Sequence, residues 1–293
     1  MDDQKKQQRI YENINEFFLR AIKLRDTGSI SNFFRFLKKV PDHSPFNNAL
    51  IFIQNPECGY YATASQWNKR FNRTIKKESR PMVVLFPFGP VDFVYDIEST
   101  EGDPITDEKL LFWWRENGGY LDNFVFENTL LNLEKIDVNF EKIKAETYFN
   151  EVDFGTGGFA QRNFLKEELR IVLHPRYEKS TIEAYGVLCH EIAHILLGHL
   201  GHVSTKPKSK NNKLVDGKEI ARDRSRISKN VKEIEAELVA WIIFNNFGVE
   251  KNSEGYIATW LTNEGEVPEI SMSDVLKVAG KIQDMGKRKD VFK

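Results

Sequence analysis

The sequence predicts an α+β protein with two domains, the first at residues 1–104 and the second at residues 105–293. Three observations lead to this prediction. The length of 293 residues exceeds that of a usual single domain. Both parts of the chain contain apolar residues at helical spacing and shorter segments that alternate as strands do. The polar segment STEGDP, at residues 99–104, is typical of a linker between them.

The composition narrows the class of protein. The net charge of −1 gives the whole chain no general attraction to nucleic acid. Its two cysteines, Cys58 and Cys189, do not make a disulfide framework and fit a reducing compartment. The opening residues MDDQKKQQRI lack the apolar core of a signal peptide, and no apolar run approaches the roughly 18 residues of a membrane span. We therefore expect a cytoplasmic globular protein without a membrane partner.

The first domain is expected to begin with helices. Apolar residues recur at helical spacing over residues 10–21, and SISNFFRFLKK predicts a second helix. In SPFNNALIFIQN, Ser44 is placed to cap a third helix, with Pro45 at its first position. Thr63 and Gln66 make a capping-box pattern for a fourth, short helix. Two strands should follow, joined by a turn at Gly89-Pro90, since residues 91–97 alternate between apolar and mostly polar.

The second domain is expected to mix helices and strands. Helices are predicted over TDEKLLFWWRENGG and over residues 121–133. KAETYFN alternates as a strand does, and ELRIVLHP is typical of a buried strand. GTGG, at residues 155–158, lacks the Lys-Ser/Thr of a phosphate loop, so a plain hairpin is favoured over a ligand loop. Ser180 and Glu183 make a second capping box, before a helix that Gly198 or Gly201 should end.

This helix contains His190, Glu191 and His194 in the pattern H-E-x-x-H. Residues four apart share one helix face, so both imidazoles can point at one metal ion. A zinc ion lowers the pKa of bound water toward about 7, and Glu191 can accept the proton of that water. The alternative is a core helix with hydrogen-bonded histidines. His199 is off this register, and we interpret it as a helix-end residue that favours the helix dipole.

A third zinc ligand is expected on a later helix, VKEIEAELVAWIIFNNFG. Glu233 and Glu237 share one face of that helix with small alanines, where buried acids need a compensating charge. We assign Glu233 as the ligand and Glu237 as the acceptor of a hydrogen bond from the outer nitrogen of His190. The swapped assignment stays open. Glu235 is expected to point away from the metal into solvent.

HEIAHILLGH followed by EIEAELVAW resembles the ImmA/IrrE-type metallopeptidases, which are similar to the wider thermolysin-like zinc group. The resemblance covers residues 169–247 and implies a zincin-like fold, with Glu233 as the third ligand. Glu237 stands where those families more commonly have Asn or Asp.

Residues 44–99 look like the N-terminal domain of ArdC-type antirestriction proteins. The resemblance is carried by the residues Asn48, Leu50, Ile51, Gln54, Pro56, Trp67, Lys76 and Lys77. It implies single-stranded DNA binding and a metallopeptidase as the partner domain. Basic charge next to exposed aromatic rings is also what single-strand binding requires. The candidate contacts are Trp67, Lys69, Arg70, Arg73, Lys76 and Lys77; the alternative is a solvated helix face over core aromatic residues.

The basic stretch at residues 204–230 favours a flexible surface insertion over a flap or a contact with an acidic partner.

Together these patterns predict a zinc-dependent metalloendopeptidase, fused to a single-strand-binding domain, with a role in antirestriction or mobile-element regulation. The strand ELRIVLHP is expected to offer its edge to an extended protein or peptide substrate. Candidate donors to the oxyanion are Tyr185, His202 and Arg222. Two alternatives stay open. One is a non-catalytic antirestriction protein that binds DNA or a partner and contains a structural zinc. The other, which the resemblance suggests, is a regulator that cleaves a repressor.

Overall fold

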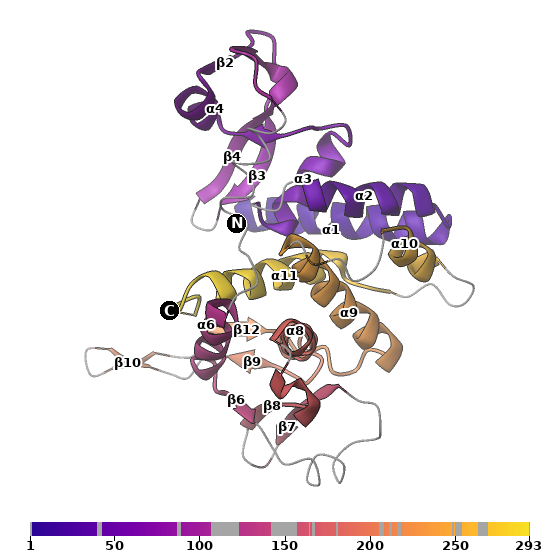
Figure 1. The fold of residues 1–293 in the computed structure, drawn as a ribbon, viewed down its shortest axis with the longest axis vertical. Coiled ribbons are helices and arrows are strands. Elements are labelled where there is room, and N and C mark those ends of the chain that lie inside the picture. Colours follow the sequence, from indigo (N-terminus) through magenta and orange to yellow (C-terminus); the bar gives the residue numbers. More distant parts are fainter. Residues whose placement is uncertain are drawn as a thin grey trace. The chain divides into compact units, whose positions relative to one another are not determined.

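The computed structural model describes residues 2–39, 43–86, 89–106, 123–141, 157–163, 165, 168–179, 181–204, 208–210, 213–215, 218–247, 249, 254–262 and 269–292. Helices and short sheets within these ranges make the fold α+β (Figure 1). The chain divides into two compact units. Unit 1 is Met1–Gly119 with Asn252–Val267, and unit 2 is Tyr120–Lys251 with Pro268–Lys293. The units differ from the predicted division at residue 104 in two respects: unit 1 extends to Gly119, and it includes a segment from late in the chain.

The helices of unit 1 surround a cluster of phenylalanine rings. These helices are α1 (Asp2–Lys23), α2 (Thr27–Lys39) and α3 (Pro45–Gln54), and α10 (Glu254–Thr262) packs against α2; a further helix, α4 (Ala64–Phe71), lies beside the strands of the unit. The ring of Phe33 meets Phe18 and Phe52 edge-on, at centroid distances of 4.7 and 5.4 Å. The predicted cap of α3 is confirmed, since the Ser44 side chain accepts a hydrogen bond from Asn47 N–H.

The strands of unit 1 form two small antiparallel sheets. One has the order β1-β4-β3, from β1 (Tyr61–Ala62), β4 (Gly89–Asp96) and β3 (Met82–Phe86); in the other, β2 (Arg73–Ile75) pairs with β5 (Thr100–Gly102). A short 3-10 helix, Ile97–Ser99, connects β4 to β5. The expected linker at residues 99–104 therefore contains a paired strand. The predicted capping box of Thr63 and Gln66 is formed and begins α4 (Ala64–Phe71).

His43 gives unit 1 a pH-dependent stability. Its ring stacks on Tyr61 at a centroid distance of 4.2 Å, and burial lowers its pKa from 6.5 to about 4. The unfolded chain therefore binds a proton on His43 near pH 6.5, whereas the folded chain binds it only near pH 4. The stabilisation is complete above about pH 6.5 and is lost as the pH falls to about 4, where the loss reaches about 3 kcal/mol.

We expect the His43→Phe variant, which keeps an aromatic ring but does not titrate, to lack this loss of stability. Urea unfolding followed by tryptophan fluorescence across the same pH range measures it. An equal loss of unfolding free energy in wild type and variant would assign the acid sensitivity to other groups.

Unit 2 is built around a mixed sheet and three long helices. The sheet has the order β6-β8-β7. Strand β6 (Val138–Glu141) is parallel to β8 (Glu168–Leu173), and β7 (Gly158–Asn163) is antiparallel to β8. Helix α8 (Thr181–Leu196) packs on the sheet and on α9 (Lys229–Asn246), and α11 (Met272–Lys287) packs on α9.

The remaining elements of unit 2 are short apart from α6. They are α6 (Asn123–Glu134), the 3-10 helix Pro175–Lys179, and the strands β9 (Val203–Ser204), β10 (Lys208–Lys210), β11 (Lys213–Val215) and β12 (Glu219–Ala221). The predicted helix TDEKLLFWWRENGG and strand KAETYFN fall outside the described residues, as does Ser180 of the second capping box.

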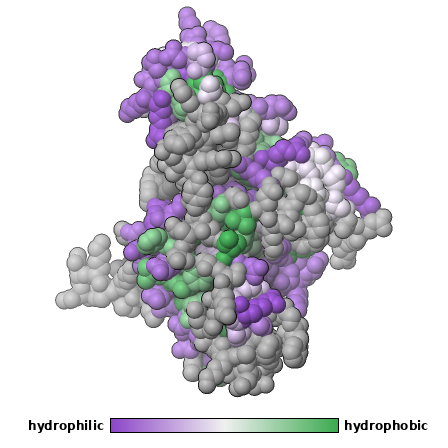
Figure 2. Space-filling model, viewed as in Figure 1, coloured by the Kyte–Doolittle hydropathy of each residue, from purple (hydrophilic) through white to green (hydrophobic). Residues whose placement is uncertain are grey.

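The face drawn in Figure 2 is mostly hydrophilic over the described residues, with hydrophobic side chains in small patches. Among the described helices, none pairs the length with the hydropathy that a membrane span requires.

Candidate metal centre

Helices α8 and α9 bring the side chains of His190, His194 and Glu233 together. The two histidine Nε2 atoms lie 3.2 Å apart. Glu233 Oε2 lies 3.4 Å from Nε2 of His190 and 3.8 Å from Nε2 of His194. Ligands bound about 2.0–2.1 Å from zinc at tetrahedral angles are about 3.3 Å apart. The three donor atoms therefore have the chemistry and the spacing of a zinc site.

Two glycines allow the helices to take these positions. At Gly186 an added Cβ would lie 2.5 Å from the Phe244 ring, so any larger residue would force that ring or the helix to shift. Gly198 has a φ of +74°, and a Cβ there would lie 1.7 Å from the carbonyl oxygen of Arg222. Gly198 therefore ends α8 and leaves room for the chain at residues 222–224 to cross it, where Arg224 N–H donates to Gly198 O.

Glu237 supports His190 from the side away from the other ligands. Its Oε2 lies 3.4 Å from His190 Nδ1, the outer nitrogen. Burial alone would lower the pKa of His190, but hydrogen bonds to Glu233 and Glu237 outweigh it and raise the pKa to about 9. Burial and the nearby charge of His190 lower the pKa of His194 to about 3.

Glu191 lies in the same pocket, which has a volume of about 550 Å³. Its carboxyl is buried, and burial raises its pKa to about 7. A hydrogen bond with the backbone of Ala160 in β7 opposes this rise. A carboxyl with this pKa can both accept and release a proton near neutral pH.

Strand β7 borders the pocket, and part of its backbone faces away from β8. His174 N–H donates to Gly157 O at 2.8 Å, and Gly158 is paired with Leu173. In an antiparallel ladder the residues alternate, so the backbone groups of Gly158, Ala160 and Arg162 point away from β8. The sequence-based expectation of an open edge on ELRIVLHP is wrong for the described residues, because β8 lies between β6 and β7.

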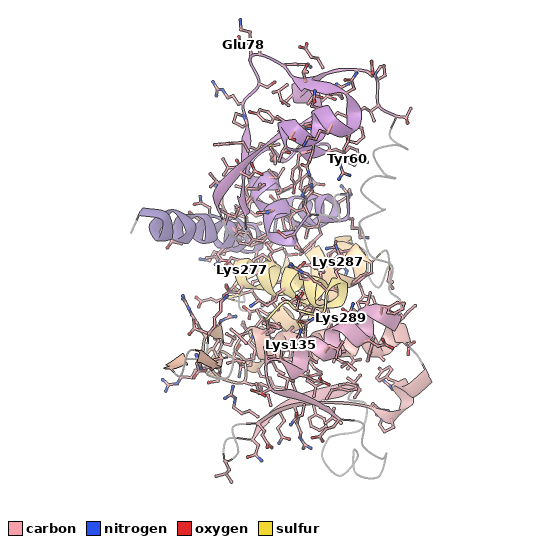
Figure 3. All side chains as sticks on the ribbon, turned by 90° about the vertical axis from the view of Figure 1, so that its left-hand side faces the viewer. Tyr60, Glu78, Lys135, Lys277, Lys287 and Lys289 are labelled. Carbon is pink, nitrogen blue, oxygen red and sulfur yellow. The ribbon has the colours of Figure 1, made fainter. Side chains whose placement is uncertain are left out.

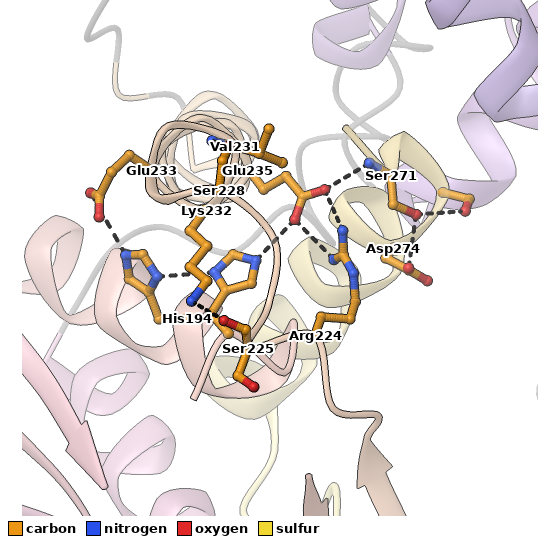
Figure 4. Close-up of polar contacts among 12 residues, drawn as sticks. His194, Arg224, Ser225, Ser228, Val231, Lys232, Glu233, Glu235, Ser271 and Asp274 are labelled. Atoms are coloured by element: carbon orange, nitrogen blue, oxygen red, sulfur yellow. Dashed lines mark hydrogen bonds and ion pairs between the residues drawn. The ribbon is translucent and has the colours of Figure 1, made fainter. Parts of the chain in front are cut away.

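Glu235 differs most from its predicted position. Instead of pointing into solvent, it is fully buried. It accepts hydrogen bonds from Arg224 at 2.7 and 2.9 Å and from Ser271 N–H at 2.7 Å (Figure 4). Its other partner is Nε2 of His199, at 2.9 Å. The signal that could have found it is the apolar face on which it lies, since Leu238, Val239 and Ile242 follow it at helical spacing and are buried.

His199 is buried as well, and its Nδ1 lies 3.0 Å from Nδ1 of His194. It therefore contacts a metal-ligand histidine, a role that the helix-end interpretation did not foresee. The prediction of a flexible surface insertion at residues 204–230 is wrong in part. Among the described residues of this stretch, strand β12 pairs with β9, and the side chain of Arg224 is only 21% exposed.

Of the candidate oxyanion donors, Tyr185 is fully buried, with its hydroxyl 3.2 Å from Thr129 Oγ1. His202 and Arg222 pair with Glu219, and none of the three candidates lines the pocket. Lys232 does line the pocket, and its Nζ donates a hydrogen bond to Ser225 O.

The candidate nucleic-acid contacts divide into residues that form hydrogen bonds within unit 1 and residues whose side chains are exposed. Trp67 is fully buried, and its indole N–H donates to Tyr95 O at 2.8 Å, so the expectation that a base stacks on it is wrong. Arg73 and Lys76 bond to the backbone of β5 and of Glu98. The side chains of Lys69, Arg70 and Lys77 are exposed. Figure 3 shows Glu78, the residue after Lys77, at the outer end of its turn.

The His190→Ala and His194→Ala variants are each expected to lose bound zinc. Metal that binds only the folded state raises its stability, so a chelator should lower the melting temperature of wild type but not of either variant. Metal analysis and thermal unfolding with and without chelator measure both effects. Full zinc occupancy in either variant would contradict the prediction that both histidines are zinc ligands.

Comparisons with protein-family models, curated proteins and solved structures found no match. The function is therefore inferred from the residues and their geometry.

Proposed function

We propose that unit 2 is a zinc-dependent metallopeptidase with a zincin-like fold, and that His190, His194 and Glu233 hold the zinc. The observation that carries this proposal is the position of three closely spaced donor atoms and a buried Glu191 in one pocket beside β7. The resemblance of HEIAHILLGH and EIEAELVAW to the ImmA/IrrE-type metallopeptidases supports it.

The ligand number favours a catalytic over a structural zinc. Structural zinc sites are closed by four protein ligands, whereas catalytic sites use three and leave a position open. Among the described residues, one ligand-type cluster is found, with three members, and it lines a pocket.

The residues of the chain supply the acid–base chemistry. When bound, zinc would polarise the substrate carbonyl and lower the pKa of water. Glu191 accepts a proton from the attacking water as the new C–O bond forms. The same carboxyl then gives this proton to the amine nitrogen as the C–N bond breaks.

The substrate that suits this pocket is an extended peptide. Backbone groups of Gly158, Ala160 and Arg162 face away from β8, and Gly158 and Ala160 line the pocket. The backbone of Ala160 already bonds to Glu191, so a peptide would use the other groups of this edge. A peptide can add to such an edge through its main chain, which places a peptide bond near the metal centre. Lys229 and Lys232, also at the pocket, favour acidic side chains near the cleaved bond.

The Glu191→Gln variant tests the proposal. It keeps the size of the side chain but cannot accept a proton, so hydrolysis should fall about 10²–10⁴-fold. Cleavage of a mixed peptide library, followed by mass spectrometry, measures hydrolysis, and metal analysis measures zinc. Wild type that binds zinc but cleaves no peptide, or a variant that cleaves as fast as wild type, would contradict a peptidase.

Single-strand binding by unit 1 stays a prediction. It now relies on the exposed side chains of Lys69, Arg70 and Lys77 and on the ArdC resemblance, without Trp67.

A further inference from the structure

We propose that Arg224, Glu235 and His199 form a hydrogen-bonded chain of positioning residues that sets the orientation and tautomer of His194 in the metal centre. This inference rests on the zinc site proposed above and extends it. None of the three residues is itself a ligand.

The chain is continuous from a cationic side chain to the metal ligand. Arg224 donates two hydrogen bonds to Glu235, at 2.9 and 2.7 Å. Glu235 Oε2 lies 2.9 Å from His199 Nε2, and His199 Nδ1 lies 3.0 Å from His194 Nδ1 (Figure 4). The side chains of His199 and Glu235 are 0% exposed, so water does not compete for these bonds.

The acceptor at the centre of the chain sets the direction of its hydrogen bonds. An ionised carboxylate only accepts, so His199 Nε2 must donate to Glu235. With one hydrogen on each neutral ring, His199 Nδ1 is then an acceptor, and His194 Nδ1 must donate to it. The Nε2 atom of His194 is left without hydrogen, on the side that faces His190 and Glu233. This is the tautomer that can bind a metal at Nε2.

The two histidine ligands are thus supported in different ways. The outer nitrogen of His190 faces the carboxylate of Glu237 directly, at 3.4 Å. The outer nitrogen of His194 reaches a carboxylate only through the ring of His199. Each arrangement keeps the imidazole from rotating away from the ion.

The hydrogen-bonded chain of Arg224, Glu235 and His199 also joins three segments of unit 2. Arg224 follows β12, and its backbone N–H bonds to Gly198 O just after α8. Glu235 lies on α9, and it also accepts a hydrogen bond from Ser271 N–H before α11. Because one carboxylate serves all these donors, its loss would disturb His199 and the segments together.

Zinc affinity of the full-length protein, measured by competition with a chromophoric chelator, tests the inference. His199→Phe keeps a ring but removes both hydrogen bonds, and it should weaken zinc binding about 10–100-fold. His199→Gln offers one acceptor and one donor, and it should recover most of the affinity. Thr129→Val, which removes a buried hydroxyl away from the site, controls for general destabilisation and should bind zinc as wild type does.

A second measurement is sensitive to position rather than stability. The visible absorption of the cobalt-substituted protein reports coordination geometry, and it should change in His199→Phe but not in Thr129→Val. Nitrogen NMR of the zinc-bound wild type should show His194 protonated at Nδ1. If His199→Phe does not fold, the isosteric Glu235→Gln replaces it, with weaker zinc binding and a shifted His194 resonance expected.

The outcomes separate the two proposals. Wild-type affinity and an unchanged cobalt spectrum in His199→Phe, or in Glu235→Gln if that variant is used, would overturn the positioning chain alone. A wild-type protein that binds no zinc would overturn both proposals. If His199→Phe weakens zinc binding and wild type cleaves no peptide, the result would support the positioning role of His199 and contradict the proposed peptidase function.

Discussion

Replacement of Glu233 by alanine is expected to abolish stable zinc binding and peptide hydrolysis. Glu233 Oε2 lies 3.4 and 3.8 Å from the inner nitrogens of the two histidines, so its loss removes one of three donors. A two-histidine remnant falls short of the three protein ligands that a catalytic zinc requires. Metal analysis after dialysis and a peptide-cleavage assay measure the two losses. Zinc retained at wild-type occupancy would show that Glu233 is not a ligand.

Glu237→Ala is the matched control, one helical turn away on the same face. Its Oε2 lies near the outer nitrogen of His190, so the variant should keep all three donors. We expect zinc affinity and activity to fall about 10–100-fold, which is less than in Glu233→Ala. A greater loss in Glu237→Ala would mean that the two glutamates exchange roles when zinc binds.

Replacement of Glu235 by alanine is expected to destabilise unit 2 by about 3–5 kcal/mol, because it leaves the half-buried Arg224 cation and the buried ring of His199 without their acceptor. Burial alone would raise the pKa of Glu235, but hydrogen bonds from His199 and Arg224 outweigh it, and the pKa lies below its ordinary value. The buried carboxylate is therefore charged and fully engaged. The variant leaves Arg224, His199 and Ser271 N–H without their acceptor.

Urea unfolding of the zinc-free protein measures this effect without a contribution from the metal. Glu219→Ala is a suitable control, since Glu219 forms exposed ion pairs and its side chain is 53% exposed. Its loss should change the free energy of unfolding by no more than about 0.5 kcal/mol. A Glu235→Ala variant as stable as Glu219→Ala would contradict the prediction that the charged Glu235 carboxylate stabilises unit 2 through its hydrogen bonds.

The sequence by itself determined the local features of this protein. The caps at Ser44 and Thr63 follow from hydrogen bonds and backbone angles within about four residues. The sequence also predicted that α8 ends at Gly198 or Gly201, and the structure places the end just before Gly198. The spacing of His190 and His194 likewise follows from the helical repeat, because residues four apart share a face in any helix. Such features do not depend on what packs against the helix.

Only the tertiary structure decided which faces are covered and which strand lies at an edge. The helical repeat places Glu235 opposite Glu233, but burial of that opposite face depends on α11 and on the segment that contains Arg224. The order β6-β8-β7 leaves backbone groups of β7 pointing away from β8, and α10 joins unit 1 from late in the chain. These outcomes depend on contacts between residues far apart in sequence, and local periodicity has no information about them.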